Sequence, residues 1–274
     1  GVSRSDLLLR HMGDVAPAIF GSLFQAVKSK EARRELGEHY TTEENILKLI
    51  GPLFLDELRA EFVANIHSRP GLRKLHERLG QMRFLDPACG CGNFLIVAYR
   101  ELRALELQIL VRLQELSGKQ VQTSLVMDED ERVRVRMSHF NGIELEEWPA
   151  TIARTAMFLV NHQANQDMSL KIGISPEQLP LSESAHIVVG NALELDWNSV
   201  LPASEDVRVM GNPPFIGARL MTAEQKAETN ALWPRGKAGL LDYCAGWYAK
   251  AAAYLADTEE AFSEQSEEVV PGLL

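Results

Sequence analysis

The sequence predicts an α/β fold in which helices cover both faces of a mainly parallel sheet. Four short apolar or β-branched runs, each about the length of a strand, alternate with longer stretches of helical periodicity. This alternation is typical of βαβ units, whose parallel strands are buried on both sides by helices. The chain has 274 residues, of which 46% are hydrophobic, and is therefore long enough to bury such a sheet.

The first half of the chain contains two expected helices, then a strand and a third helix. Residues 4–35 place apolar side chains at intervals of three and four, which predicts a helix. A capping box, with Thr41 as N-cap and Glu44 three residues later, begins the next helix. Residues 82–85 are the first expected strand, and a glycine-rich turn then leads into a long helix that begins near Asn93.

The second half continues the alternation. A run that ends near Glu144 predicts a strand, and PATIARTAMFLVNHQ predicts the helix after it. Two further strands are expected in AHIVVGNALEL and VRVMG, and a last helix in LLDYCAGWYAKAAAYLA. Residues 257–274 are acidic, lack Lys and Arg, and are expected to be disordered. The expected organisation is thus an N-terminal helical segment at 1–35, the main α/β domain at 36–256, and this tail.

Charge and cysteine content exclude several classes of protein. The net charge is -10, so any contact with nucleic-acid phosphates must come from local basic patches. No apolar run approaches the roughly 20 residues that span a bilayer, and the N-terminus lacks a signal peptide's apolar core. We therefore expect a cytoplasmic protein without a membrane partner. Cys89, Cys91 and Cys244 match neither a disulfide framework nor a usual zinc spacing, so we expect no metal site.

The segment FLDPACGCGNF has the layout of a cofactor-binding loop. A strand ends at Asp86, and Gly90 and Gly92 precede a helix, an arrangement that lets the backbone approach a nucleotide-type ligand closely. Leu95 stands where a dinucleotide fingerprint has its third glycine, and Pro87 is foreign to that fingerprint. The loop therefore disfavours NAD. A tight strand-to-helix connection without a ligand is the alternative.

A second polar segment, GNPPF, ends the strand in VRVMG. Two prolines follow Asn212 directly, and proline cannot donate to a sheet ladder, so the strand must stop there. On its own this pattern is often just a strand-ending turn. Open parallel sheets nevertheless bind ligands beyond the carboxyl ends of their strands, where both segments fall.

The two segments together resemble a known enzyme family. DPACGCG resembles the first motif of S-adenosylmethionine-dependent DNA methyltransferases, with Cys91 in place of the usual serine, and NPPF resembles their catalytic motif. GEHYTTEENI, NGIELEEWPA, GNALELDW and LDYCAGWYAKAA extend the likeness over residues 36 to about 256, although Thr42 stands where proline is common. The closest likeness is to the adenine-N6 DNA methyltransferases of MmeI-like (type IIG/IIL) restriction-modification enzymes.

The resemblance implies a class I methyltransferase (Rossmann-like) fold, S-adenosylmethionine as the cofactor and double-stranded DNA as the partner. It implies that Glu144 accepts the ribose hydroxyls, Asn191 reads the adenine amino group, and Tyr40 and Thr41 close over the methionine. A solvated acid, a turn asparagine and a helix cap are the respective alternatives for Glu144, Asn191 and Thr41. The full set of implied cofactor-binding residues is Tyr40, Thr41, Asp86, Pro87, Ala88, Cys89, Gly90, Gly92, Asn93, Phe94, Glu144, Asn191 and Ala192.

The implied catalytic residues are Asn212, Pro213, Pro214 and Phe215. Adenine N6 is a poor nucleophile because its lone pair is conjugated with the ring. The carbonyl oxygens of Asn212 and Pro213 are neutral acceptors that can hold both N6 hydrogens and stabilise the charge that develops on nitrogen. The target base must leave the duplex to reach them, and Phe215 can offer it a stacking face.

Several alternatives stay open. An Asn-Pro-Pro-aromatic tetrad also suits planar amides, so an RNA or protein-glutamine methyltransferase is a second reading, and a non-catalytic remnant or regulatory fragment is a third. We expect the sheet to be incomplete at its C-terminal end and the target-recognition region to lie outside the chain, so that DNA is contacted mostly through absent regions. The chain by itself is then expected to bind the cofactor, with sequence-specific DNA methylation weak or absent. The strand at 207–211 would then be an exposed edge and a natural site of self-association. Tyr243 and Trp247 are expected in the core.

Overall fold

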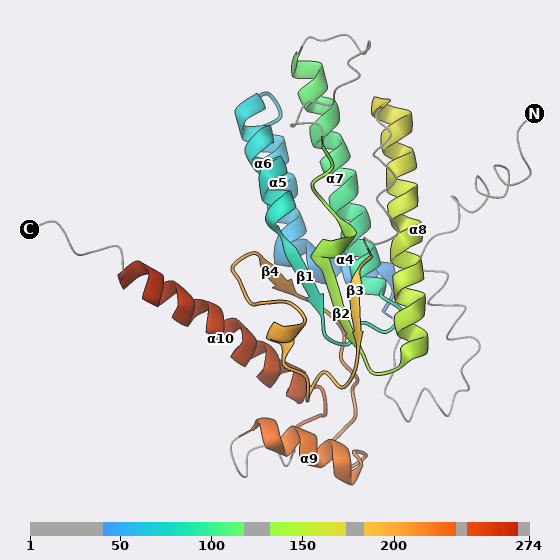
Figure 1. The fold of residues 1–274 in the computed structure, drawn as a ribbon, viewed down its shortest axis with the longest axis vertical. Coiled ribbons are helices and arrows are strands. Elements are labelled where there is room, and N and C mark those ends of the chain that lie inside the picture. Colours follow the sequence, from blue (N-terminus) through green and yellow to red (C-terminus); the bar gives the residue numbers. More distant parts are fainter. Residues whose placement is uncertain (1–40, 118–131, 174–183, 234–239, 268–274) are drawn as a thin grey trace, which may run out of the picture.

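The computed structural model describes residues 41–117, 132–173, 184–233 and 240–267 (Figure 1). Side chains are described as far as residue 256. The helix expected at 4–35, the N-terminal segment 1–35 that contains it, and Tyr40 therefore lie outside the described residues, and so does the end of the expected tail.

Four parallel strands form the sheet, as the alternation of strands and helices predicts. Its strands lie in the order β3-β2-β1-β4, with β1 and β2 in the interior. The bounds are Arg83–Asp86 for β1, Phe140–Glu144 for β2, His186–Val189 for β3 and Val207–Val209 for β4. Because all four strands run in the same direction, their carboxyl ends, and the loops that follow, meet at one edge of the sheet.

Helices cover both faces of this sheet, and the alternation of side chains along each strand decides which core a residue joins. Phe84 and Phe140 stack at 4.7 Å on one face, against the layer of helices from α4 to α8. Leu85 and Ile143 point to the other face and pack with Trp197 and Trp247. The helices are α4 Glu43–Ile50, η1 Gly51–Leu55, α5 Asp56–Ala64, α6 Arg69–Gln81, α7 Asn93–Ser117, η3 Met137–His139, α8 Glu147–Ile172, η4 Trp197–Ser199, α9 Ala223–Leu232 and α10 Ala245–Glu267.

Three local features differ from the sequence predictions. The N-cap of α4 is Thr42, whose side chain accepts from the backbone of Asn45, and not Thr41. Helix α10 continues to Glu267, beyond the boundary expected at residue 256, so the start of the acidic tail is helical (Figure 1). Helix α9 was not predicted at all.

Strand β4 is the last strand in the order of the described sheet. Its partner in the described sheet is β1, with Leu85 opposite Val209. Because β4 has a neighbouring strand on one side there, it lies at an edge, as expected. Self-association through this edge stays a prediction.

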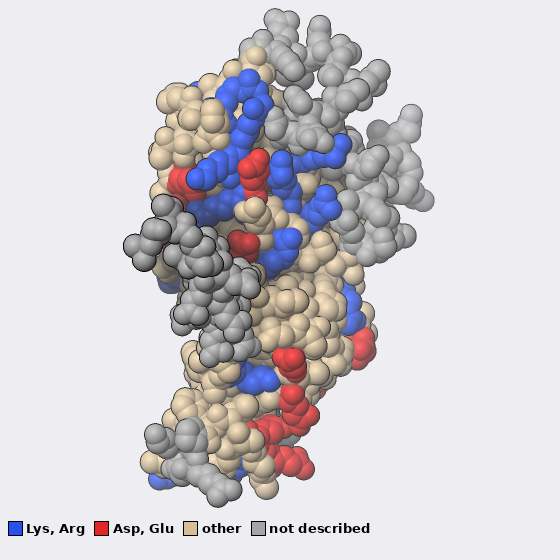
Figure 2. All heavy atoms as spheres, turned by 60° about the vertical axis from the view of Figure 1, so that its left-hand side comes forward, with Lys and Arg blue, Asp and Glu red and all other residues tan. Residues whose placement is uncertain are grey.

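Charge is distributed unevenly over the surface. Lys and Arg side chains gather on the upper part of the face in Figure 2, while Asp and Glu are more frequent toward its lower end. The acidic net charge therefore does not prevent local basic patches. Within the described ranges, every helix is too short or too polar to cross a membrane.

Candidate active site

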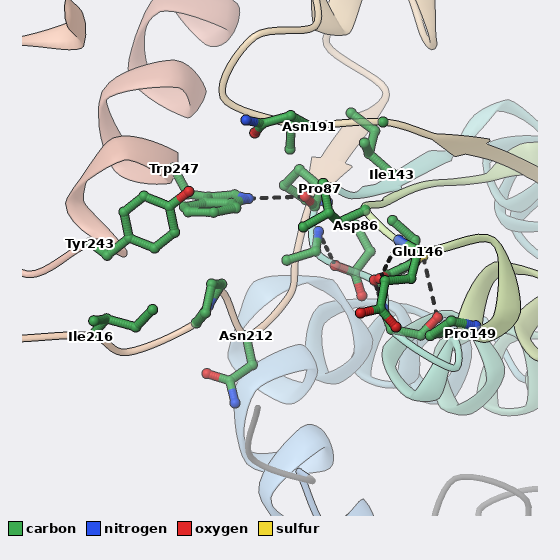
Figure 3. Close-up of a pocket in the computed structure, with 18 of the residues that line it drawn as sticks. Asp86, Pro87, Ile143, Glu146, Pro149, Asn191, Asn212, Ile216, Tyr243 and Trp247 are labelled. Atoms are coloured by element: carbon green, nitrogen blue, oxygen red, sulfur yellow. Dashed lines mark hydrogen bonds between the residues drawn. The ribbon is translucent and has the colours of Figure 1, made fainter. Parts of the chain in front are cut away.

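The loops at the carboxyl ends of the four strands surround a cavity of about 420 Å³ (Figure 3). This volume lies within the usual range of small-molecule sites. Thirteen of the predicted site residues line it: Thr41, Asp86, Pro87, Ala88, Cys89, Gly90, Asn93, Phe94, Glu144, Asn191, Ala192, Asn212 and Pro214. Gly92, Pro213 and Phe215 are not among the lining residues, and Tyr40 is not described.

The two glycines of the loop after β1 have different structural roles. Gly90 has a φ of 53°, and a Cβ added there would meet no atom within 4 Å, so its α-carbon faces open space beside the cavity. Gly92 has a φ of 84°, and its added Cβ would lie 3.0 Å from the Cβ of Ala153. Gly92 thus permits close packing of the loop on α8, whereas Gly90 leaves room that a ligand can fill.

Glu144 is held at the end of β2 by two backbone donors. Its Oε2 accepts a 2.9 Å hydrogen bond from the Gly90 amide, and its Oε1 accepts a 3.0 Å bond from the Glu146 amide. The loop after β1 and the loop after β2 are therefore joined through one carboxylate. Each carboxylate oxygen can accept more than one hydrogen bond, so the group remains suited to a pair of hydroxyl donors.

Asp86 lies under the same loop and is almost completely buried, at 1% exposure. Its Oδ1 accepts from the Ala88 amide at 3.0 Å. Burial raises the pKa of Asp86 to about 7; the Ala88 hydrogen bond opposes this rise and the nearby Glu144 charge adds to it. A Cβ on Gly211 would overlap Asp86 Oδ1, so glycine is needed immediately before the Asn-Pro-Pro-Phe segment.

Asn212 follows β4 and reaches the cavity from the other side of β1. Its Nδ2 donates a 3.0 Å hydrogen bond to Oγ1 of Thr41, which lies just before α4. Phe215 is 53% exposed, so its ring is accessible from solvent. Pro214 lines the cavity between these two residues.

The far wall of the cavity is built by segments that sequence reasoning missed or assigned to the core. Tyr243 and Trp247 are buried, as predicted, but they also line the cavity, and Trp247 Nε1 donates to the Pro87 carbonyl at 2.9 Å. Four residues from the start of α9 onward complete the wall: Thr222, Glu224, Gln225 and Glu228. The capping box formed by Thr222 and Gln225 was the signal in the sequence that could have located this helix.

The residues that line the cavity fit a nucleoside-bearing ligand. Gly90 provides open space beside the backbone, and Glu144 provides a fixed carboxylate. Asn93 Oδ1 is buried and has no hydrogen-bond partner among the described residues, although it belongs to a residue that lines the cavity. An orphaned buried acceptor of this kind needs a donor, and a bound ligand can provide one.

Comparisons with known proteins agree with this geometry. Residues 62–268 match the family model described as MmeI, DNA-methyltransferase domain. DNA methyltransferase A of Bacillus subtilis (strain 168) is 38% identical over 255 residues, which cover 91% of this chain and 28% of that protein. A solved structure of the type IIL restriction-modification enzyme MmeI in complex with DNA has 44% identity and a TM-score of 0.79, and the match covers 88% of this chain and 32% of that one.

The chain thus spans about a third or less of the length of these relatives. The family model nevertheless matches most of the chain, and the matched region contains both the glycine loop after β1 and the Asn-Pro-Pro-Phe segment after β4. The parallel sheet agrees with the fold expected from those two segments. On these grounds the chain belongs to the family of MmeI DNA-methyltransferase domains, as its sequence motifs indicate.

Proposed function

We propose that the chain binds S-adenosylmethionine in this cavity and, as part of a longer restriction-modification or phage-defence enzyme, directs methyl transfer to N6 of adenine in double-stranded DNA. The observation that supports this most strongly is that Gly90, Glu144 and Asn212, which follow three different strands, line one cavity. A cofactor loop and a set of amine acceptors thereby share a single space.

The order of the strands supports one direction for the bound cofactor. Asn212 follows β4, Asp86 ends β1 and Gly90 follows it, Glu144 ends β2, and Asn191 follows β3. Glu144 can accept the two ribose hydroxyls, which places the base toward β3 and the methionine toward β1 and β4. The transferable methyl group then lies on the side where Asn212 enters the cavity.

The cofactor, when bound, supplies an electrophilic methyl group on a sulfonium centre. Asn212 supplies the acceptor for the incoming amine. Its Nδ2 is engaged by Thr41, so its carbonyl oxygen is the end that can accept from N6. Such an acceptor draws the N6 hydrogens out of the ring plane and stabilises the positive charge that develops on nitrogen. We assign the second acceptor to the Pro213 carbonyl and the stacking face to Phe215, whose ring is accessible.

The cofactor assignment is tested by calorimetric titration of the purified chain with S-adenosylmethionine. Saturable one-to-one binding is expected, and its absence would contradict the assignment. The catalytic assignment is tested in the longer enzyme, with methyl-labelled cofactor and mixed-sequence duplex DNA, followed by digestion to nucleosides. Label is expected in N6-methyladenine; label in another base, in RNA or in protein glutamine would favour a different substrate class.

An Asn212→Ala variant separates binding from transfer. Loss of methyl transfer with retained cofactor binding is the expected result, because Asn212 Oδ1 is proposed to act on the amine and not on the cofactor. Asn230→Ala is the matched control, since Asn230 is exposed on α9 and does not line the cavity. Equal activity of the two variants would remove Asn212 from the mechanism.

A further inference from the structure

We propose that Glu228 is a positioning residue that fixes the amide of Asn191 and thereby makes the cavity select a cofactor base with an exocyclic amine. The inference rests on the proposed use of S-adenosylmethionine, and it concerns how that ligand is distinguished from one whose base carries a carbonyl in place of the amine. Glu228 lies on α9, a helix that belongs to neither of the two sequence motifs.

Asn191 lies where the base of a bound cofactor is expected. It follows β3, and the backbone amide of the preceding residue, Gly190, donates to the Glu144 carbonyl at 2.8 Å. A ligand whose ribose is held by Glu144 therefore extends its base toward Asn191. Both residues line the same cavity, and Figure 3 shows Asn191 on the loop that passes above Pro87 and Trp247 in this view.

An asparagine amide has two ends of nearly equal shape, so its partners decide which end meets a ligand. Asn191 Nδ2 donates to Glu228 Oε1 at 2.8 Å, and Asn191 Oδ1 accepts from the Leu193 amide at 3.0 Å. A carboxylate only accepts and a backbone amide only donates, so the two contacts select the same orientation. The carbonyl oxygen, which has a second lone pair, is left as the acceptor for the ligand.

Tyr243 fixes Glu228 in turn. Its hydroxyl donates to Glu228 Oε2 at 2.6 Å, so each carboxylate oxygen of Glu228 has one protein donor. Burial and the neighbouring Glu228 both raise the pKa of Tyr243, which keeps the phenol protonated as a donor. Hydrogen bonds thus run in series from Tyr243, in the turn before α10, through Glu228 on α9 to Asn191 in the loop after β3.

The consequence is discrimination between bases. When the amine of the base is replaced by a carbonyl, the hydrogen bond to the Asn191 oxygen is lost. Two acceptor oxygens, that of Asn191 and that of the base, then face each other. Calorimetry with S-adenosylhomocysteine and S-inosylhomocysteine, which differ at this position, measures the effect on the whole chain. For the parent chain we expect the adenine form to bind at least about tenfold more tightly.

Glu228→Gln is the decisive variant, because a glutamine amide can pair with either end of Asn191, which leaves the Leu193 amide as the one described contact that still favours a single orientation. The ratio of the two affinities should fall severalfold. Glu205→Gln is the control, since it removes the same charge from an exposed residue that does not line the cavity. Tyr243→Phe should reduce the ratio by a smaller factor, and it tests the inference if Glu228→Gln does not fold.

The outcomes are distinct. A ratio that falls in Glu228→Gln but not in Glu205→Gln supports the positioning role. An unchanged ratio in Glu228→Gln and Tyr243→Phe overturns it, as does an equal loss of affinity for both ligands, which would indicate a purely structural residue. If the parent chain binds neither ligand, the proposed function itself fails, and this inference fails with it.

Discussion

The side-chain amide of Asn212 donates a 3.0 Å hydrogen bond to the hydroxyl oxygen of Thr41, which lies 171 positions earlier in the sequence. Thr41 comes directly before α4, and Asn212 directly after β4. The contact joins the start of the helical layer to the segment proposed to be catalytic. It also fixes which end of the Asn212 amide is left to accept from a substrate amine.

Replacing Thr41 by Val removes this acceptor while keeping the shape of the side chain. We expect the free energy of unfolding to fall by about 1 kcal/mol, the usual net value of such a hydrogen bond. Methyl transfer should fall about tenfold, because the Asn212 amide can then rotate. Urea titration and single-turnover methyl transfer are the two measurements.

Thr41→Ser is the matched control, since it retains the hydroxyl. Both quantities should stay close to those of the parent chain. If Val and Ser at this position behave alike, the hydrogen bond has no role in orienting Asn212.

Alanine at Gly90 should mainly weaken cofactor binding, whereas alanine at Gly92 should mainly lower stability. Both glycines have positive φ, so each substitution costs roughly 1–2 kcal/mol of backbone strain. A Cβ at Gly90 enters open space beside the cavity, so the affinity for the cofactor should fall at least about tenfold. A Cβ at Gly92 presses on Ala153, so stability should fall further while affinity changes less. Thermal unfolding and calorimetry of the two variants distinguish the cases, and a larger affinity loss in Gly92→Ala would reverse the assignment.

Asp86 should make the protein less stable as the pH rises. Its pKa is about 7 in the folded chain and near its ordinary value of 3.8 in the unfolded chain. The folded chain therefore binds more protons between about pH 4 and pH 7, and the free energy of unfolding falls through that window. Asp86→Asn removes the buried charge, so at pH 8 we expect it to be more stable than the parent chain, by an amount on the order of a few kcal/mol. At pH 4 the two should be nearly equal.

His139 changes the stability with pH in the opposite direction to Asp86. The quantity to measure is therefore the difference in the free energy of unfolding between Asp86→Asn and the parent chain. Burial, together with the charges of Arg83 and Arg136, lowers the pKa of His139 from 6.5 to about 4. The unfolded chain binds the extra proton here, so this residue makes the protein more stable as the pH rises through the same range. Denaturant titrations at several pH values give the difference directly. A difference that does not vary with pH would show that Asp86 has an ordinary pKa.

The features that could be predicted from the sequence are those decided by local chemistry. The strands that lead to Asp86, Glu144 and Asn212 could be predicted from short apolar or β-branched runs, and proline closes the first and the last of the three segments. The choice between Thr41 and Thr42 as N-cap could not, because both are good caps and the contact of Thr41 with Asn212 settles which one remains.

Helix α9 escaped prediction because it has no clear apolar stripe; among its residues, Thr229 is the one classed as buried. Its contribution to the cavity, through Glu228, depends on the tertiary fold and carries no periodic signal. Helix α10 exceeds its predicted length because an acidic sequence that contains several Glu residues still has high helix propensity. Acidic composition alone was therefore a poor criterion for disorder after residue 256.

The position of β4 in the sheet has a consequence for the order in which the protein assembles. β4 pairs with β1, a strand from much earlier in the chain, so this pairing closes a long loop and is expected late in folding. The pairing of β1 with β2 and the attachment of the loop at Gly90 to Glu144 need only earlier parts of the chain. During synthesis the cofactor loop can therefore form before the segment at Asn212 has left the ribosome, and early cofactor binding would then stabilise the template on which that segment docks.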